Sequence, residues 1–334
     1  PKAGGQEPEK KKEVSAPLVA QRVSKLASRY EVDFGESGVL GTGTFSTVRV
    51  ATHRQSGIRY AVKAISLLDI HHQTLVRLRR EIQILQNLSH PNIISLYEIF
   101  EENNTLYMVM EMCTGGELWH FLQRVEIYPN GEKFYMTNKG KVPLTEEKVA
   151  SIVKQMVDAV AYCHERHVAH RDLKLENLML AHSGEEAAIK LIDFGFCKVF
   201  HGENDMRAVL GSPYYVAPEV LQARGPGSVN QAKGYGSPAD MWSIGVITFM
   251  VLCGQAPFDG NDDTERLKAV KRGVFSYPVT AALSANAVSF VNGLLQMNPA
   301  KRMTAKAALN HPWLRATKSA RTPKFQKWSF AQWD

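Results

Sequence analysis

HRDLKLEN, residues 170–177, is the strongest signal in this sequence, because it places three kinds of chemistry in one short loop. Asp172 supplies a carboxylate, Lys174 an ammonium group and Asn177 an amide oxygen. These groups suit, in that order, acceptance of a hydroxyl proton, contact with a phosphoryl group in transfer, and ligation of a metal ion. The spacing therefore predicts a phosphoryl-transfer loop.

A second carboxylate follows at a fixed distance from this loop. Asp193 lies sixteen residues after Asn177, in the sequence IDFG, directly after an apolar stretch at residues 189–192 that predicts a strand. A carboxylate at a strand end beside a glycine can bind Mg²⁺. Together with Asn177, Asp193 is predicted to hold the metal.

A glycine-rich segment near residue 41 supports a nucleotide site. Gly41, Gly43 and Ser46 lie between two stretches that alternate polar and apolar residues. Glycines let backbone N–H groups approach phosphate oxygens, which a Cβ atom would hinder. A plain hairpin turn is the alternative. A dinucleotide site of the βαβ type is disfavoured because no helix follows.

Lys63 and Glu81 each allow two interpretations. A lysine in an alternating strand ordinarily faces solvent, yet Lys63 lies in YAVKAI among apolar residues, downstream of the glycines. Glu81 shares a helix face with Arg77 and Leu85 by i, i+4 spacing, so it could form a surface pair with Arg77. The alternative is that Glu81 pairs with Lys63 and holds it near the phosphates.

Composition narrows the possible classes of protein. The 334 residues carry a net charge of +7, but the first thirty and the last twenty residues each carry +4 and the centre only −1, which disfavours a nucleic-acid-binding fold. The four cysteines are far apart and none forms CxxC, which predicts an intracellular, cytoplasmic location. The longest apolar run, residues 241–253, is too short for a transmembrane segment and predicts a buried helix.

The chain divides by pattern into a strand-rich part and a helical part. Residues 1–31 predict a basic, largely disordered extension, 32–112 a strand-rich lobe with one helix near 75–88, and 113–314 a helical lobe. Two polar, turn-rich segments, 128–141 and 223–237, predict surface insertions. Residues 315–334 form a basic and aromatic tail.

The ordered set of motifs resembles the eukaryotic Ser/Thr protein kinases over roughly residues 32–314. The set comprises the glycine segment, AVKAI, Glu81, HRDLKLEN, DFG at 193–195, APE at 217–219 and DMWSIG at 240–245. GSPYYVAPEVL and ALNHPWL are similar to the calcium/calmodulin-dependent group, and in particular to the kinase domain of calcium-dependent protein kinases. The resemblance implies an α+β fold of two lobes, a small antiparallel β-sheet lobe with one major helix and a larger, mainly α-helical lobe. It also implies ATP and Mg²⁺ as cofactors.

The resemblance also implies a role for each site residue. Asp172 would accept the substrate hydroxyl proton, Lys174 would contact the γ-phosphate, and Lys63, with its partner Glu81, would hold the α- and β-phosphates. Arg302 would pair with Glu219 of APE. The nucleotide would be enclosed by Leu40, Gly41, Thr42, Gly43, Thr44, Phe45, Ser46, Val48, Ala61, Met110, Glu111, Cys113 and Met179, with Asn177 and Asp193 on the metal.

Substrates and partners follow from the same resemblance. Glu117 and Glu176 match acidic positions that receive an upstream arginine in basophilic relatives, so protein substrates with Ser/Thr acceptors preceded by basic residues are expected. An ordinary surface role for these two acids is the alternative. The tail could be a packed linker or the start of a segment for a calcium-sensor domain or calmodulin-like partner. No nucleic-acid partner is expected.

The segment between DFG and APE lacks the hydroxyl that regulatory phosphorylation would need. No Ser or Thr occurs between Phe196 and Gly211. Glu203 and Asp205 could instead contact Arg171, with one charge each where a phosphate carries about −1.5 to −2, or they could face solvent. We therefore expect activity without phosphorylation of this loop. A pseudokinase scaffold is the main alternative, and a small-molecule phosphotransferase is disfavoured by the long segment.

Overall fold

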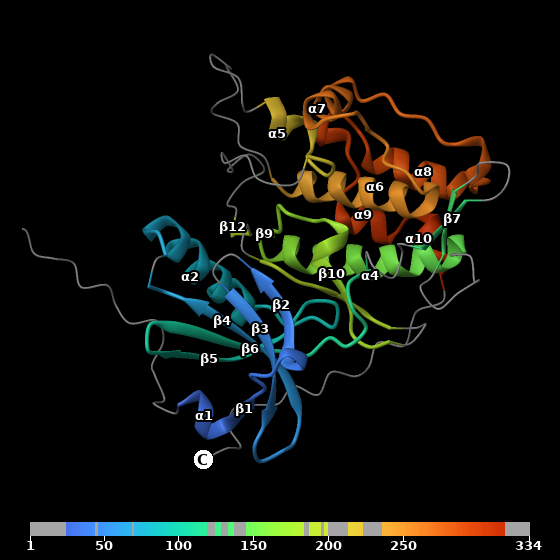
Figure 1. The fold of residues 1–334 in the computed structure, drawn as a ribbon. Coiled ribbons are helices and arrows are strands. Elements are labelled where there is room, and N and C mark those ends of the chain that lie inside the picture. Colours follow the sequence, from blue (N-terminus) through green and yellow to red (C-terminus); the bar gives the residue numbers. More distant parts are fainter. Residues whose placement is uncertain are drawn as a thin grey trace, which may run out of the picture.

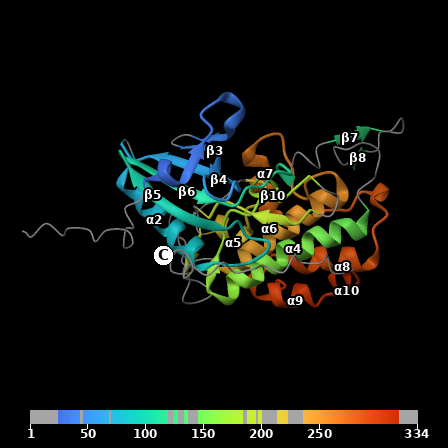
Figure 2. The same ribbon diagram turned by 90° about the horizontal axis from the view of Figure 1, so that it is seen from below.

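The computed structural model has two parts, a curled β-sheet with one long helix and a larger bundle of helices (Figures 1 and 2). It describes residues 25–43, 46–68, 70–118, 124–127, 133–136, 145–183, 187–194, 197–199, 213–222 and 236–317. This is the two-lobed α+β fold that the sequence predicts.

The small lobe is an antiparallel sheet whose strands follow the order β1-β3-β4-β6-β5, with β2 paired to β3. Asn103 and Asn104 connect β5 to β6 with positive φ angles of 49° and 56°, which asparagine tolerates in a tight hairpin. The strands are β1 (Tyr30–Val32), β2 (Val39–Gly43), β3 (Ser46–His53), β4 (Arg59–Ser66), β5 (Leu96–Glu102) and β6 (Thr105–Met110).

Part of the segment expected to be a disordered extension belongs to this sheet. Residues 25–31 form α1 (Leu26–Arg29) and the start of β1, whose partner is β3. Leu26 and Tyr30 are buried in a small apolar cluster with Val62 and Phe100, on the opposite side from the main core. The burial of these two side chains explains why order begins before residue 32.

The helix of the small lobe, α2 (His72–Asn87), connects the sheet to the main core. Leu78, Ile82 and Leu85 repeat at helical spacing and are buried in the same cluster as the central helices of the large lobe. At the N-terminus of α2, His71 makes no side-chain capping bond, and the first turn contains no acidic residue. The helix is therefore held by its apolar face rather than by its N-terminus.

The large lobe is built around two adjacent helices, α4 (Glu146–Glu165) and α6 (Ser237–Cys253) (Figure 1). Residues 239–251 of α6 are all buried, as predicted for the apolar run. Among the described residues, no helix is long and apolar enough to cross a membrane. Around this pair lie α5 (Pro218–Gln222), α7 (Asp263–Arg272), α8 (Ala285–Leu294), α9 (Ala305–Leu309) and α10 (Pro312–Arg315).

The amino terminus of α4 is fixed to the end of the helical lobe. Thr145 caps the helix, and Glu146 accepts hydrogen bonds from the backbone N–H of Ser284 and from Nε1 of Trp313, the latter at 2.9 Å. Burial opposes ionisation, but these bonds keep the pKa of Glu146 below its usual value. One carboxylate therefore joins α4, α8 and α10.

Short strands hold the loops that face the small lobe. The strand β9 (Val168–Ala169) pairs with β12 (Lys198–Val199), and β10 (Leu178–Leu180) pairs with β11 (Ile189–Leu191). These four strands bracket the HRDLKLEN and DFG motifs on both sides.

The first of the two expected surface insertions contains regular structure. The strand β7 (Arg124–Ile127) pairs with β8 (Lys133–Met136), so a hairpin replaces part of the turn-rich loop expected at 128–141. The sequence KFYM of β8 carries two aromatic residues of high strand propensity. The prediction gave more weight to the turn-forming residues around them. The second insertion lies outside the described residues except for Gly236 and Ser237, which begin α6.

Candidate active site

The HRDLKLEN loop brings a carboxylate, an ammonium group and an amide into direct contact. Nζ of Lys174 lies 2.8 Å from Oδ2 of Asp172, and Nδ2 of Asn177 donates to the backbone oxygen of Asp172 at 2.8 Å and to the same Oδ2 at 3.2 Å. The Asp172 side chain is 4% exposed. Two donors therefore fix the orientation of one buried carboxylate.

A second buried carboxylate, Asp240 of α6, holds the backbone of this loop from below. Its Oδ2 accepts from the N–H of His170 at 2.9 Å and lies 2.8 Å from Nε2 of His164, while Oδ1 accepts from the N–H of Arg171 at 2.8 Å. Burial alone would raise the pKa of Asp240, but the bond and charge of His164 and the backbone donors hold that pKa below its usual value. Asp240 thus stays ionised as an anchor.

The anchored backbone is strained at the residue before Asp172. Arg171 has a φ of +71°, in the left-handed region that is costly for a residue with a long side chain. The N–H groups of residues 170 and 171 converge on Asp240, and this convergence requires the unusual turn. The strain is therefore compensated by the bonds to Asp240.

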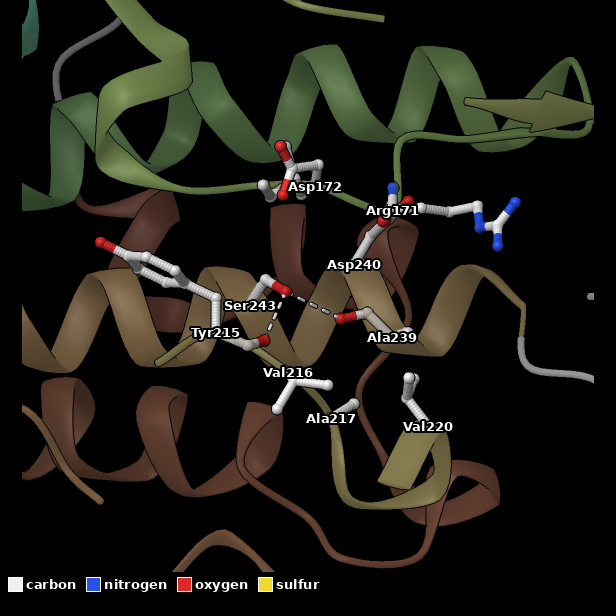
Figure 3. Close-up of a pocket in the computed structure, with 10 residues that line it drawn as sticks. Arg171, Asp172, Tyr215, Val216, Ala217, Val220, Ala239, Asp240 and Ser243 are labelled. Atoms are coloured by element: carbon white, nitrogen blue, oxygen red, sulfur yellow. Dashed lines mark hydrogen bonds between the residues drawn. The ribbon is translucent and has the colours of Figure 1, made fainter. Parts of the chain in front are cut away.

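A small cavity of about 20 Å³ is lined by residues of this loop, of α6 and of residues 215–220 (Figure 3). Ser243 lies between two backbone carbonyls in Figure 3, with Oγ 2.9 Å from the oxygen of Tyr215 and 3.2 Å from that of Ala239. The hydroxyl connects α6 to the segment that precedes APE. The side chains of Arg171 and Asp172 point in different directions from neighbouring positions.

Asp193 and Phe194 follow β11 on the side facing α2. Asp193 has a φ of +60°, and the fully buried ring of Phe194 lies edge-on to His170 at 5.0 Å between centroids. Burial lowers the pKa of His170 although three nearby aspartates oppose this, so its ring is neutral near pH 7. Gly195 and Phe196 lie outside the described residues.

Lys63 and Glu81 face each other in the small lobe, whereas the alternative pair with Arg77 concerns a side chain outside the described ones. Nζ of Lys63 on β4 lies 3.9 Å from Oε1 of Glu81 on α2, and the Glu81 side chain is 9% exposed. Burial raises the pKa of Glu81, the Lys63 charge opposes that shift, and the Asp193 charge adds to it. Asp193 therefore lies within electrostatic reach of this pair.

The glycine segment forms the β2–β3 hairpin. Gly41 pairs with Val48 and Gly43 with Ser46, while Thr44 and Phe45 lie outside the described residues. A Cβ atom added to Gly41 would meet no protein atom within 4 Å, so the packing of the chain does not require a glycine there. The open space fits the close approach of a phosphate group.

The other residues predicted to enclose the nucleotide lie on strands of both lobes and on the segment after β6. In the sheet, Val48 is paired with Lys63 and Ala61 with Met110, and Leu40 is on β2. Glu111 and Cys113 follow β6, and Met179 on β10 forms a bridge with Glu117. Glu176 is exposed in the turn at 175–177, close in sequence to Asp172.

The donor set beside Asp172 fits a hard divalent cation. Because Nδ2 of Asn177 donates to Asp172, the amide oxygen is the end of that side chain that can ligate a metal ion. Asp193 supplies a carboxylate, and neither residue offers nitrogen or sulfur. Oxygen ligands of this kind suit magnesium better than a transition metal.

An ion pair farther from the loop holds the first turn of α5. NH1 and NH2 of Arg302 donate to the two carboxylate oxygens of Glu219 at 2.7 and 2.9 Å, the pairing that the family resemblance implies. The Arg302 side chain is fully buried. A bidentate, buried pair of this type fixes orientation as well as position.

Sequence reasoning alone missed two features of the site. One is the hydrogen bonding of Asp240 and His164, although an acidic residue at the start of an apolar helix is a usable signal. The other is an ion pair between Lys190 and Glu111, whose Nζ and Oε1 are 2.7 Å apart. Lys190 falls at the centre of a strand of apolar residues, which could have drawn attention to it.

A lysine held by a glutamate, a buried carboxylate loop and an oxygen ligand set, placed between two such lobes, define a phosphotransferase. The model of the protein kinase domain matches residues 34–314, and the chain belongs to this family. It is a protein serine/threonine kinase of the calcium/calmodulin-dependent group, and kinases of this family act on proteins with ATP and a divalent metal ion.

Three relatives illustrate the similarity. Myosin light chain kinase A of Dictyostelium discoideum is 37% identical over 85% of this chain and 88% of its own length. Calcium-dependent protein kinase 5 of Plasmodium falciparum is 33% identical over 90% and 48%, and calcium/calmodulin-dependent protein kinase type II of Caenorhabditis briggsae is 33% identical over 87% and 50%. The chain thus spans about half the length of the latter two.

Proposed function

We propose that this chain transfers the γ-phosphoryl group of ATP to serine or threonine hydroxyls of proteins, with Mg²⁺ as the metal. The observation that carries the proposal is the buried Asp172 carboxylate held by Lys174 and Asn177, with the Lys63–Glu81 pair on the other side of the site. Asp172 orients the hydroxyl and accepts its proton, while Lys174 contacts the γ-phosphate.

The other residues supply position and charge. Lys63 holds the α- and β-phosphates and Glu81 holds Lys63, while Asn177 and Asp193 are the Mg²⁺ ligands. Backbone groups of Glu111 and Cys113 bind adenine, with Val48, Ala61 and Met179 against its ring and Met110 at the rear. Little covalent chemistry is asked of the protein, so orientation and electrostatic stabilisation provide most of the rate enhancement.

The test is a peptide phosphorylation assay with matched site variants. Asp172→Asn should lower kcat by about 10²- to 10⁴-fold and leave ADP binding intact, because it removes the proton acceptor alone. Lys63→Met should weaken both turnover and nucleotide binding. If the wild-type chain binds ATP but phosphorylates no peptide, or if Asp172→Asn is as active as wild type, the proposal is wrong and a scaffold role is favoured.

We propose in addition that basic residues upstream of the acceptor are preferred. The proposal is supported by the exposed position of Glu176 in the turn at 175–177 and by the bridge of Glu117 to Met179, three residues after Glu176, which puts both acids close to the loop of Asp172. An Arg-x-x-Ser peptide should be phosphorylated faster than its Arg→Ala version. Glu176→Gln should reduce that ratio, and equal rates for both peptides would contradict the preference.

Activity without phosphorylation of the loop after DFG is the next proposal. It rests on the absence of Ser and Thr between Phe196 and Gly211. Protein treated with phosphatase should retain its kcat. A loss of activity that is restored by incubation with ATP would contradict the proposal.

We propose that residues 32–314 form the kinase unit, with lobes at 32–112 and 113–314. Regulation is then expected from segments outside this unit. Relatives named as calcium-dependent or calcium/calmodulin-dependent kinases support a calcium-sensor domain or calmodulin-like partner that acts through the basic, aromatic tail at 315–334. Truncation after Leu314 should change kcat if the tail is regulatory. We also propose an intracellular location, which the free thiols of the four cysteines support.

A further inference from the structure

A buried ion pair joins the strand before DFG to the segment that connects the two lobes. Lys190 on β11 is 4% exposed, and its Nζ lies 2.7 Å from Oε1 of Glu111, which directly follows β6. The Lys190 side chain is 5% exposed and the Glu111 side chain 20%, so the contact lies largely out of water, where a charged hydrogen bond is strong. This pair is therefore a fixed connection rather than a surface contact.

Glu111 is held at three atoms. Its backbone N–H donates to the oxygen of Ser95 at 2.9 Å, and its Oε2 accepts from the N–H of Ser95 at 3.3 Å. Lys190 takes the remaining carboxylate oxygen. Ser95 and Lys190 together leave the residue little freedom to rotate its peptide groups.

The strand that carries Lys190 is itself held on both sides. Lys190 is paired with Met179 of β10, and the next residue, Leu191, donates to the oxygen of Asn92 at 2.8 Å and accepts from the N–H of Ile94 at 3.0 Å. Asp193 follows only three residues after Lys190. The ammonium group therefore reaches Glu111 from one of the most firmly held backbones near the site.

The charges of the pair extend to Cys113, two residues farther along the connecting segment. Burial raises the pKa of the Cys113 thiol to about 12, the charge of Glu111 adds to this shift, and the charge of Lys190 opposes it. Burial and Glu111 likewise raise the pKa of Tyr97 to about 12. The charges of Lys190 and Glu111 thus act on the segment that would bind adenine.

We propose that Lys190 is a positioning residue for the adenine base, because it fixes Glu111 and so keeps the backbone groups of Glu111 and Cys113 at the spacing that adenine requires. The inference rests on the proposed use of ATP and adds a determinant of nucleotide affinity to it. Lys190 itself need not touch the nucleotide. A group placed in advance of binding lowers the entropy that the ligand must lose on binding.

The primary test is calorimetric binding of ADP to the full chain and to Lys190→Met. Met removes the charge and preserves most of the side-chain volume. We expect the Kd for ADP to rise about tenfold, and the Kd for adenosine to rise by the same factor, since the effect concerns the base. In turnover, the KM for ATP should rise while the KM for peptide stays unchanged and kcat at saturating ATP changes less than about twofold.

Three further variants separate positioning from general stability. Lys190→Arg retains the charge and should recover most of the affinity. The double variant Lys190→Met/Glu111→Gln removes both charges of the pair, so it should fold even if Lys190→Met does not, and its ADP affinity should remain low. Glu146→Gln removes a hydrogen-bonded carboxylate at α4, so it should lower the Tm without changing the Kd for ADP.

The outcomes that overturn the inference are defined by these controls. Wild-type affinity for ADP in Lys190→Met, or in the double variant if the single one does not fold, contradicts a positioning role. An equal loss of affinity in Glu146→Gln shows that binding follows stability alone and also contradicts it. If the wild-type chain binds ADP but fails to phosphorylate peptide, the proposed function fails while the positioning role of Lys190 is still decided by binding.

Discussion

The two halves of the site are held in different ways. In the large lobe, Asp172 rests on a backbone that Asp240 fixes through buried bonds of 2.8 and 2.9 Å. In the small lobe, the nearest charged atoms of Lys63 and Glu81 are 3.9 Å apart, and α2 begins at His71 without a side-chain cap. The carboxylate that we propose as proton acceptor is therefore held by short buried bonds, whereas the lysine that we propose for the phosphates has a longer contact with a helix that lacks a side-chain cap.

This difference has a physical basis in burial. The residues of α6 around Asp240 are buried on every side, so each unpaired polar group there would be costly. The α2 helix buries one apolar face and exposes the rest, so its position depends on packing that tolerates small shifts. The more rigid support of Asp172 and the more adjustable support of Lys63 thus lie in separate lobes.

The largest effect is expected from removal of the anchor in the large lobe. Asp240→Ala leaves the N–H groups of His170 and Arg171 without their acceptor, which should lower the free energy of unfolding by about 3–5 kcal/mol and also lower kcat. Urea denaturation and peptide turnover measure the two effects. Asp158→Ala is the matched control, because Asp158 forms a half-exposed carboxylate–histidine pair with His90 and should cost less than about 1 kcal/mol.

Removal of the charge in the small lobe should affect rate and spare stability. Glu81→Gln should lower kcat by about 10- to 100-fold, since Lys63 loses the partner that directs it. The free energy of unfolding should change by less than about 1 kcal/mol, because burial already disfavours the ionised form of Glu81. A loss of stability as large as that of Asp240→Ala would remove the distinction between the lobes.

Activity and stability should be lost at different pH values in acid, because Glu81 and Asp240 have pKa values shifted in opposite directions. Glu81 has a raised pKa in the folded state, so the carboxylate that attracts Lys63 is lost as pH falls through a value above 4.5, and activity should fall there. Asp240 has a lowered pKa, so its contribution to stability is present above about 3.8 and is lost as pH falls through its lower folded value. The kcat–pH profile should therefore fall before urea stability does, and in Glu81→Gln this acidic limb should disappear.

The smallest effect should come from a cap on α2. His71→Ser supplies the missing acceptor for the first turn, in a backbone conformation (φ −61°, ψ 142°) typical of capping residues. Amides in the first turns of α2 should gain about 0.5–1 kcal/mol of protection in hydrogen exchange. Thr145→Ala removes the existing cap of α4, so the amides of α4 should lose protection in hydrogen exchange. No change in α2 would indicate that its N-terminus is already fixed by packing.

Much of the fold and the chemistry could be predicted from local sequence. The apolar run at 241–253 predicts a buried helix because no other short structure buries it on all sides, and HRDLKLEN is compact enough to be recognised alone. The pairing of Glu81 with Lys63 was one of two alternatives, and the structure places their charged atoms 3.9 Å apart. Glu219 and Arg302 were paired by resemblance rather than by any local pattern.

What could not be predicted depends on contacts between distant positions. Asp240 reaches the backbone 69 and 70 residues earlier in the chain, and nothing in its immediate neighbours specifies those partners. Lys190 and Glu111 are similarly remote, and each is compatible with an exposed position when only its own segment is considered. The β7–β8 hairpin was missed because turn-forming residues surround a four-residue strand.

The contacts of Glu146 have a consequence for the order of folding during synthesis. This residue at the start of α4 is bonded to Trp313, which is 167 residues later in the chain. Contacts with large sequence separation form late because the loop that they close must first lose its freedom. The β-sheet of the small lobe consists largely of neighbouring hairpins, so it can form while the rest of the chain is still being synthesised. The helical lobe cannot form its contact between α4 and α10 until the last helix has been synthesised. The nascent protein would hold half of its active site before the other half can close.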